Sequence, residues 1–263
     1  MTQTNYKLLV NTLDVWYEKL HVLDNLSFRV KEGEVVSIIG PSGCGKSTLL
    51  LHIGGFLKNK DRCIIINGQD ISALNQRVSI LFQDQTLFPW KTLRQNILLG
   101  LKKEKLSKES EIDRATKFIS EIRLTGFEDY YPHQLSGGMK QRAAIAQACI
   151  SDPELILMDE PFGSLDALTR RQMQNILLEI IEKNKRTVLM VTHDIEEAIL
   201  ISDSIIVLSK KPAKILAQIN IPLPRPRKHQ LLTTEQAAHL KKRIMNILEN
   251  ESDEQLFSNY SAF

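Results

Sequence analysis

Two segments of this sequence combine glycine, lysine, hydroxyl and carboxylate groups in an order that can bind and cleave a phosphate chain. The first, GPSGCGKS at residues 40–47, fits the pattern G-x-x-x-x-G-K-[ST]. Its glycines let consecutive backbone N–H groups surround a phosphate at the positive end of a helix dipole. Lys46 would add charge for the β- and γ-phosphates, and the Ser47 hydroxyl would be a ligand for Mg²⁺. The predicted phosphate loop comprises Gly40, Pro41, Ser42, Gly43, Cys44, Gly45, Lys46, Ser47 and Thr48.

The second segment places two carboxylates directly after an apolar strand. Residues 155–160 read LILMDE, so four apolar residues precede Asp159 and Glu160. Ligand sites of open α/β sheets lie at the carboxyl ends of strands, and a charge at the end of a buried strand is costly unless it meets a cation. Asp159 is therefore a candidate for holding Mg²⁺ through water, and Glu160 for orienting or deprotonating the attacking water. The alternative is a strand end that runs into a solvated turn.

A third segment, LSGGMKQR at residues 135–142, precedes a predicted helix and lies upstream of the two carboxylates. A serine and two glycines at a helix start make another anion-binding helix N-terminus. One nucleotide does not need two such sites from one chain. Two chains packed head to tail would use both, because each would give its second site to the other's nucleotide. The residues of this second site are Ser136, Gly137, Gly138 and Met139.

With this motif the chain resembles the nucleotide-binding subunit of an ATP-binding cassette (ABC) transporter, whose signature sequence is written LSGGQ. Met139 stands where that signature has glutamine, and the resemblance covers about residues 5–210. It implies ATP and Mg²⁺ as cofactors and ATP hydrolysis coupled to transmembrane transport. It also implies a second copy of the chain as a partner, in a sandwich around two nucleotides.

The resemblance implies roles for further single residues. Tyr17 matches the aromatic residue that stacks on adenine, and Gln83 in LFQD matches the glutamine that touches both Mg²⁺ and the membrane partner. Residues 164–166 match the loop that crosses the dimer interface, and His193 in VTHD matches the switch histidine near the γ-phosphate. Taken singly, Tyr17 is more simply a packing residue and His193 an ordinary core or surface residue. The implied catalytic residues are Glu160, His193 and Gln83, and the implied metal ligands are Ser47, Gln83 and Asp159.

The pattern of apolar residues predicts an α/β fold. Uninterrupted apolar strands that alternate with helical stretches indicate a parallel sheet covered on both faces. The predicted strands are 35–39, 155–158, 187–191 and 205–208, and the predicted helices are 47–56, 138–150 and 167–182. A charged, mostly helical block at 96–131, with Ser107 as an N-cap, reads as a separate helical subdomain.

The resemblance refines this fold to a P-loop NTPase (RecA-like) core with an N-terminal antiparallel β portion and an inserted α-helical subdomain. The expected divisions are an ABC ATPase domain at 5–230, with the helical subdomain at about 86–150, and a C-terminal helical extension at 231–263.

The chain changes character after Leu208. Prolines in IPLPRPR (221–227) exclude regular helix and central strand, so this segment is predicted to be an extended linker. The sequence TTEQ at 233–236 then predicts a capping box with Thr233 as the cap, and an amphipathic helix through Leu248. Three roles are open for this helix: regulation, docking on a partner, or covering apolar surface.

Composition and charge restrict the partners. A net charge of +3, spread along 263 residues, does not indicate a nucleic-acid partner. The cysteines, Cys44, Cys63 and Cys149, lack metal-ligand spacing and are expected to be reduced cytosolic thiols. The N-terminus lacks a signal-peptide pattern, and no apolar run reaches the roughly 18 residues that cross a bilayer. A membrane role would therefore depend on a partner, and the resemblance implies peripheral attachment at the cytoplasmic side of the inner membrane.

One further segment suggests a branch of the family. Residues 86–93 (TLFPWKTL) would expose Trp90 where a membrane partner docks. Similar Leu-x-Pro-Trp sequences and Pro-Arg-rich tails, here at 222–227, occur in importers of nitrate, sulfonates, taurine and thiamine-precursor pyrimidines. The implied partners are permease subunits and, indirectly, a solute-binding protein. Alternatively, Pro89 and Trp90 simply cap the hinge of the helical subdomain.

Other classes of function fit the sequence less well. A soluble ABC ATPase of DNA repair or ribosomes would carry long coiled coils or two cassettes, and neither is present in the sequence. A small-molecule P-loop kinase would have no use for the glycines after Ser136. A non-catalytic module is disfavoured because Lys46, Asp159, Glu160 and His193 are all present.

Overall fold

The structure is a computed structural model of the chain, and it describes residues 6–58, 62–71, 78–83, 87–101 and 106–260. The chain divides into two compact units: residues 1–75 with 187–263, and residues 76–186. Asn5, Asp84 and Thr86, which belong to predicted segments, lie outside the described residues.

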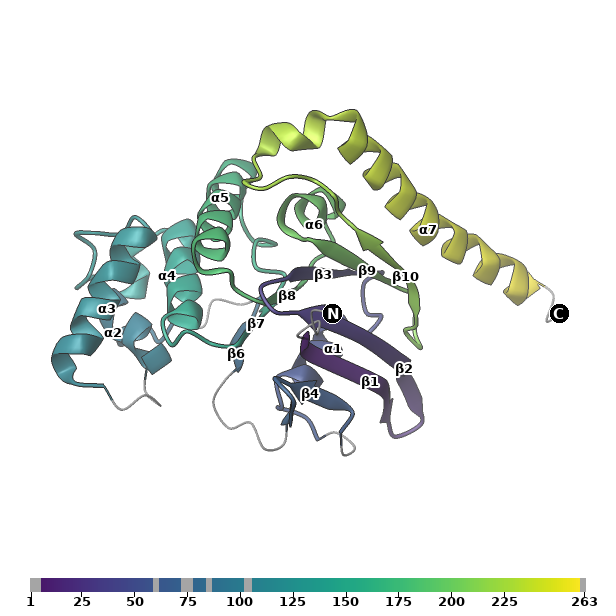
Figure 1. Cartoon of the computed structure of the whole chain (residues 1–263), viewed down its shortest axis with the longest axis horizontal. Coiled ribbons are helices and arrows are strands. Elements are labelled where there is room, and N and C mark those ends of the chain that lie inside the picture. Colours follow the sequence, from purple (N-terminus) through teal and green to yellow (C-terminus); the bar gives the residue numbers. More distant parts are fainter. Residues whose placement is uncertain (1–5, 59–61, 72–77, 84–86, 102–105, 261–263) are drawn as a thin grey trace, which may run out of the picture. The chain divides into compact units, whose positions relative to one another are not determined.

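The first unit combines an antiparallel sheet with a group of mainly parallel strands (Figure 1). The antiparallel sheet has the order β2-β1-β4-β5. In the other group β3 pairs in parallel with β8 on one side and with β9 on the other, and β10 pairs antiparallel with β9. The strands are β1 (Tyr6–Tyr17), β2 (Leu20–Lys31), β3 (Val35–Ile39), β4 (Ile64–Ile66), β5 (Gln69–Asp70), β8 (Val188–Val191), β9 (Ser204–Leu208) and β10 (Ile215–Asn220).

The helices of the first unit connect or follow these strands. Helix α1 (Lys46–Ile53) follows β3, and α6 (Ile195–Ile201) follows β8. A 3-10 turn, η4 (His229–Thr233), leads into the long C-terminal helix α7 (Glu235–Tyr260). All five residues of β3 and all four of β8 are buried, which explains their unbroken apolar sequences.

The second unit is mostly helical (Figure 1). It contains one parallel pair of strands, β6 (Val78–Leu81) and β7 (Leu155–Asp159). Its helical segments are α2 (Leu93–Leu98), η2 (Leu99–Leu101), α3 (Lys108–Glu121), η3 (Pro132–Gln134), α4 (Gly137–Cys149) and α5 (Ala167–Asn184).

Side-chain caps fix the starts of the longer helices in the second unit. The Ser107 hydroxyl accepts a hydrogen bond from the Ser110 backbone N–H at 3.3 Å, which confirms the predicted cap of α3. Ser136 accepts from Met139 N–H at 3.3 Å at the start of α4. Asp166 accepts from the N–H groups of Leu168 and Thr169, both at 3.1 Å, at the start of α5.

The predicted α/β class is confirmed, since parallel strand pairs, an antiparallel β portion and a helical insertion are all present. The strands and helices predicted between residues 35 and 208 agree with the observed ones to within a few residues at each end. The cysteines are free, buried thiols. The contact-defined second unit is wider than the predicted helical subdomain, and the functional domain boundaries stay predictions.

Two expectations for the C-terminal region need correction. The cap of α7 is Thr234 rather than Thr233, because the Thr234 hydroxyl accepts from Ala237 N–H at 3.3 Å while Thr233 ends η4. The helix continues to Tyr260, beyond the predicted end at Leu248.

Strand β10 was not predicted at all: only one of its six residues, Ile219, is buried, so its sequence lacks the apolar run of a central strand.

Candidate functional site

The phosphate loop of the first unit connects β3 to α1. Gly43 and Gly45 have φ values of 73° and 118°, which residues other than glycine rarely adopt. Any Cβ at Gly45 would lie 2.9 Å from side-chain carbons of Val22 and Leu23. Strand β2 therefore approaches the loop so closely that only glycine fits at this position.

The loop is suited to an anion. Helix α1 begins at Lys46, has no side-chain cap, and has no acidic residue in its first turn. Its first N–H groups and the positive end of its dipole thus meet no competing carboxylate from the first turn. The Lys46 side chain is buried, and its Nζ donates to the carbonyl oxygens of Gly40 and Pro41, each at 2.9 Å. An ammonium group has three donors, so Lys46 can add a charge-assisted bond to a phosphate held there.

Other residues of the loop divide into exposed and buried groups. Ser42 and Ser47 are exposed, so the Ser47 hydroxyl is accessible to a metal ion or a phosphate. Cys44 is buried, and burial raises the pKa of its thiol. Cys44 is therefore a neutral packing residue within the loop.

His193 follows β8, the strand beside the one that enters the loop. Ile38 pairs with Val191, and the N–H of Thr192 donates to the Ile38 carbonyl at 3.2 Å. His193 is exposed, and Asp194 directly after it caps α6. Parallel strands β3 and β8 thus bring the phosphate loop and His193 to the same edge of their sheet.

Tyr17 ends β1 with its side chain about half exposed, so its ring is open to a ligand. Trp16 beside it is held by its neighbours: its ring stacks on His21 at 3.9 Å between centroids, with an interplanar angle of 4°. Asp14 accepts from Trp16 Nε1 at 2.9 Å and bonds His21 Nε2 at 2.7 Å. Both rings are accessible, with Tyr17 45% and Trp16 54% exposed, but one face of the Trp16 ring is already covered by His21.

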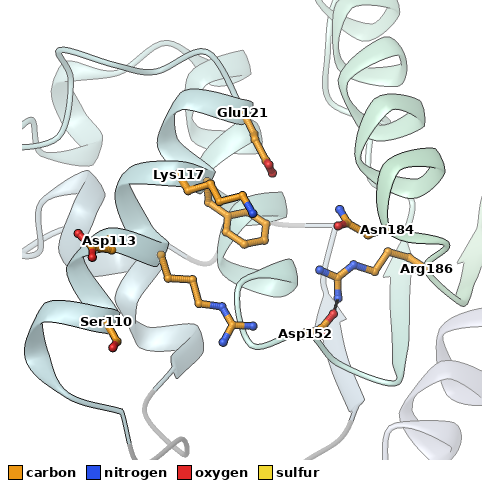
Figure 2. Close-up of a pocket in the computed structure, with 9 residues that line it drawn as sticks. Ser110, Asp113, Lys117, Glu121, Asp152, Asn184 and Arg186 are labelled. Atoms are coloured by element: carbon orange, nitrogen blue, oxygen red, sulfur yellow. Dashed lines mark hydrogen bonds and ion pairs between the residues drawn. The ribbon is translucent and has the colours of Figure 1, made fainter.

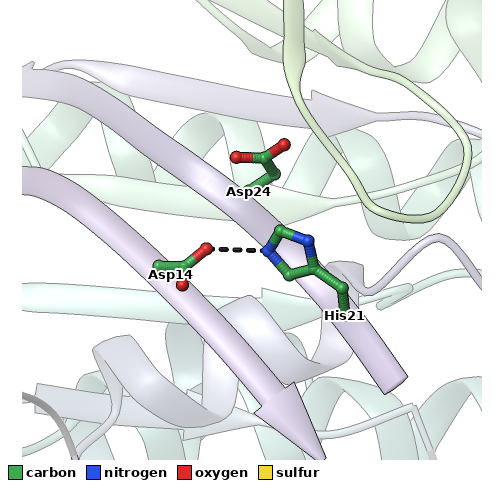
Figure 3. Close-up of side chains that lie close together, drawn as sticks. All are labelled: Asp14, His21 and Asp24. Carbon is green, nitrogen blue, oxygen red and sulfur yellow. Dashed lines mark hydrogen bonds and ion pairs between the residues drawn. The ribbon is translucent and has the colours of Figure 1, made fainter. Parts of the chain in front are cut away.

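Asp24 lies close to Asp14 and His21, and the three present ligand atoms within 4.8 Å of one another (Figure 3). Asp24 Oδ2 also pairs with Lys214 Nζ at 3.0 Å, and its bonds from Lys214 and Asn25 hold the pKa of this carboxyl below its usual value. The cluster was not predicted from the sequence, because its members lie on two strands and its partner Lys214 lies just before β10. Its cationic partner and its hydrogen bonds account for it as a structural network.

Gln83 and Glu160 meet in the second unit. Gln83 Nε2 donates to Glu160 Oε2 at 3.3 Å. Asp159 ends β7 after four buried residues, and both it and Glu160 are half-buried. Glu160 has a φ of 44°, an unusual backbone conformation for a residue with a side chain. Such strain is common at functional sites and here turns the chain sharply after β7.

The second predicted anion-binding motif forms the start of α4. Ser136 caps the helix, and Gly138 packs so closely on α5 that an added Cβ would lie 2.5 Å from Thr169 Cγ2. Further along α4, the buried Gln141 donates through Nε2 to the carbonyl of Pro161, the residue after Glu160. The structure therefore links the helix of this motif to the loop that carries Glu160, which sequence spacing alone did not indicate.

The second unit also contains a polar cavity of about 540 Å³ that no predicted site residue lines (Figure 2). One wall is a face of α3 that includes Arg114, Lys117 and Glu121, and the opposite wall has Asp152 and Arg186. The buried Arg186 guanidinium pairs with Asp152. This ion pair joins the loop after α4 to the end of α5.

A phosphate loop, two adjacent acids at the end of a buried strand, and a second serine-glycine helix start together define a P-loop nucleotide-binding cassette. Comparison with known proteins identifies the family to which this cassette belongs. Residues 23–163 match the protein family described as ABC transporter. The aliphatic sulfonates import ATP-binding protein SsuB of Bacillus cereus is 41% identical, over 91% of this chain and 95% of that protein.

Two solved structures are similar as well. One is cbiO1 from Clostridium perfringens, part of the ABC transporter complex cbiONQ, with a TM-score of 0.75 and 26% identity, over 94% of this chain and 99% of that chain. The other is the dimeric structure of MJ0796, a bacterial ABC transporter cassette, with a TM-score of 0.71 and 31% identity, over 82% and 100%. The chain belongs to the ABC transporter family, and it is an ATP-binding ATPase of that family. Among the described residues, no helix is both long and apolar enough to span a membrane.

Proposed function

We propose that this chain powers an importer for a small solute, hydrolysing ATP at its phosphate loop as one of two identical subunits. The observation that carries the proposal is the loop itself. Buried Lys46 lies at an uncapped helix start with no acidic residue in the first turn, an arrangement suited to a polyphosphate.

Each residue of the predicted site has its own proposed role in binding or hydrolysing ATP. Gly40 to Thr48 hold the phosphates, and Tyr17 stacks on adenine. Ser47, Gln83 and Asp159 offer the oxygen ligands that Mg²⁺ prefers, and the ion would neutralise charge on the phosphates. Glu160 orients or deprotonates the attacking water, and its hydrogen bond with Gln83 supports a shared role. His193 contacts the γ-phosphate.

A second copy of the chain completes each site in this proposal. Residues 136–139 would bind the nucleotide held by the other copy, because Ser136 and the glycines after it form an anion-binding helix start in addition to the phosphate loop. The dimeric state of the MJ0796 cassette supports this arrangement. Bound ATP then contributes contacts to both copies, and hydrolysis removes them.

The membrane partner is proposed to be a permease, served by a solute-binding protein, with the chain attached at the cytoplasmic side of the inner membrane. Support comes from the importer relative and from an exposed aromatic turn. Phe88 and Trp90 are 42% and 68% exposed, with ring centroids 5.3 Å apart. Buried Asn96 fixes the turn, since its side chain accepts from Phe88 N–H at 2.7 Å and donates to Lys91 and Thr92 carbonyls, both at 3.0 Å. An aromatic residue on a rigid turn suits an apolar partner surface.

The solute is proposed to belong to the sulfonate, nitrate, taurine and thiamine-precursor group. The SsuB relative is named as an aliphatic sulfonates import ATP-binding protein, and this name supports the sulfonate branch. No solute pocket is expected in this chain, because the solute would pass through the permease.

Two measurements test the proposal. Purified chain with MgATP should release phosphate, and Lys46→Ala should abolish this release while the exposed control Lys31→Ala retains it. Affinity-tagged chain, extracted from host membranes in mild detergent, should copurify with a multispanning permease in a two-to-two ratio. A soluble partner, with no permease in the membrane fraction, would instead support a non-transport ABC ATPase.

A further inference from the structure

Helix α7 packs its first half on α6, the helix that follows His193 (Figure 1). Ala237, Leu240 and Ile244 repeat at helical spacing and are 2%, 7% and 0% exposed. They share one apolar cluster with Ala198 and Ile199 of α6. The C-terminal extension therefore covers the outer face of α6 within the first unit.

An ion pair reinforces this contact near His193. Lys241 Nζ lies 2.6 Å from Glu196 Oε1, and Glu196 is in the first turn of α6, three residues after His193. The hydrogen bond from Lys241 to Glu196 and the charge of this carboxylate raise the pKa of Lys241. The apolar seam and the ion pair together restrain the start of α6.

The start of α6 is connected to His193 by short backbone links. Asp194 Oδ1 accepts from the N–H groups of Glu196 and Glu197 at 2.9 and 3.1 Å. Asp194 N–H donates to Thr192 Oγ1 at 3.0 Å, and Thr192 N–H donates to Ile38. His193 thus lies between an anchor on β3 and the cap of α6, so a shift of α6 changes the position of His193.

The far end of α6 is held by the linker before α7. Arg227 is buried, and its guanidinium donates to carbonyl oxygens at the end of α6 and just beyond it, among them Ile199 at 3.3 Å and Ser202. The linker and α7 therefore restrain α6 at its C-terminal end and along its outer face, respectively.

We infer that α7 is a positioning element for His193. Lys241 at the first turn of α6 and Ile244 in the shared apolar cluster set where the His193 imidazole lies relative to the γ-phosphate. They touch neither nucleotide nor water. The inference rests on the proposed role of His193 in ATP hydrolysis. It assigns a role to the C-terminal extension other than solely covering apolar surface.

The test combines charge reversal with its rescue. Lys241→Glu places two carboxylates together and should lower kcat about two- to fivefold, with KM for ATP unchanged, because the phosphate loop still binds the nucleotide. The double variant Lys241→Glu with Glu196→Lys restores the pair and should restore kcat. Lys242→Glu, an exposed neighbour on α7, is the matched control and should leave both constants unchanged.

A second pair of variants separates positioning from loss of stability. Ile244→Ala opens a cavity in the apolar cluster that α7 shares with α6, whereas Ile66→Ala opens one at an equally buried position outside this cluster. Amide hydrogen exchange of residues 193–201 without nucleotide should become about tenfold faster in Ile244→Ala and not in Ile66→Ala. Only Ile244→Ala should lower kcat.

Failure of the positioning role and failure of the proposed ATPase function give different results. Equal losses of kcat in Ile244→Ala and Ile66→Ala, or an unchanged kcat in Lys241→Glu, would overturn the positioning role. An amide exchange rate of residues 193–201 that is unchanged in Ile244→Ala would overturn the positioning role as well. If wild-type chain hydrolysed no ATP, the proposed function would fail, while the exchange experiment would still report whether α7 restrains the His193 segment.

Discussion

At the scale of single residues, Glu160 combines features that suit a catalytic base. Its carboxylate accepts from Gln83, and its backbone has a positive φ directly after the buried strand β7. Eight other described residues with side chains also have a positive φ, so the contact with Gln83 and the place at the end of β7 carry the assignment. The neighbouring Asp159 still belongs to the strand, so the chain turns between the two acids and they can perform different tasks.

Substitution of Glu160 by glutamine tests this role. Glu160→Gln keeps the size and hydrogen-bonding capacity of the side chain but removes its basicity. We expect phosphate release to fall at least about 100-fold while ATP still binds. The measurement is single-turnover hydrolysis beside binding of a fluorescent ATP analogue. Rapid hydrolysis by this variant would exclude Glu160 as the base, and Glu179→Gln, at an exposed position on α5, is the control.

The two aromatic residues at the end of β1 make separate predictions. Tyr17→Ala should raise KM for ATP about tenfold, because stacking on a base is worth roughly 1–3 kcal/mol, and Tyr17→Phe should restore it. Trp16→Ala should change KM little, since the Trp16 ring is already stacked on His21. A rise in KM for Trp16→Ala alone would mean that Trp16 carries the base instead. Steady-state kinetics over a range of ATP concentrations decides between them.

At the scale of elements, the cap of α5 gives the fold a pH-dependent contribution. Bonds from Thr169 and Leu168 hold the pKa of Asp166 below its usual value of 3.8. A lowered folded-state pKa contributes stability above the unfolded-state value, and this contribution is lost as pH falls through the folded-state value. Asp166→Ala should therefore lower the unfolding midpoint at neutral pH, and its deficit should shrink below pH 3.8.

Asp166→Asn provides the matched control, because asparagine caps helices about as well as aspartate but does not titrate. This variant should keep a pH-independent cap through the same range. Thermal unfolding from pH 7 to pH 3 measures both variants. A deficit of Asp166→Ala that stays constant down to pH 3 would contradict the assignment.

Arg227 joins the linker to α6, and its loss should be costly. Arg227→Met removes donors from several buried carbonyls, including those of Ile221 and Leu223 at 3.1 and 3.2 Å. We expect the free energy of unfolding to fall by about 2–4 kcal/mol, because buried acceptors lose charged donors. Arg243→Met, at an exposed position of α7, should change it little. Urea unfolding measures both, and equal effects would show that burial of Arg227 is not important for stability.

The sequence predicted elements well where a local pattern dictates them. Apolar strands such as β3, and caps such as Ser107, need no distant partner to be recognised. Prolines correctly predicted the extended linker. The burial of Arg227 within it was missed, because several carbonyls that it satisfies, including that of Ser202, lie some 25 residues earlier in the chain. Strand β10 and the Asp14–His21 pair were missed for the same reason: tertiary contacts, rather than local patterns, define them.

At the scale of the whole molecule, the proposed mechanism depends on two copies sharing each nucleotide. Each chain carries two helix starts that are proposed to bind phosphate, at Lys46 and at Gly137. Each unit also presents predicted site residues: Tyr17, the phosphate loop and His193 in the first, and Gln83, Asp159, Glu160 and residues 136–139 in the second. ATP would act as the contact that both copies share, so ATP binding and dimer formation should be thermodynamically linked.

The most direct test of this account is the molecular mass of Glu160→Gln in solution, measured by light scattering with and without MgATP. With MgATP the mass should be about twice the chain mass of 30.0 kDa, and without nucleotide it should equal one chain. Adding Lys46→Ala to this variant should abolish the increase. A mass of one chain, with ATP demonstrably bound, would contradict the shared-nucleotide mechanism.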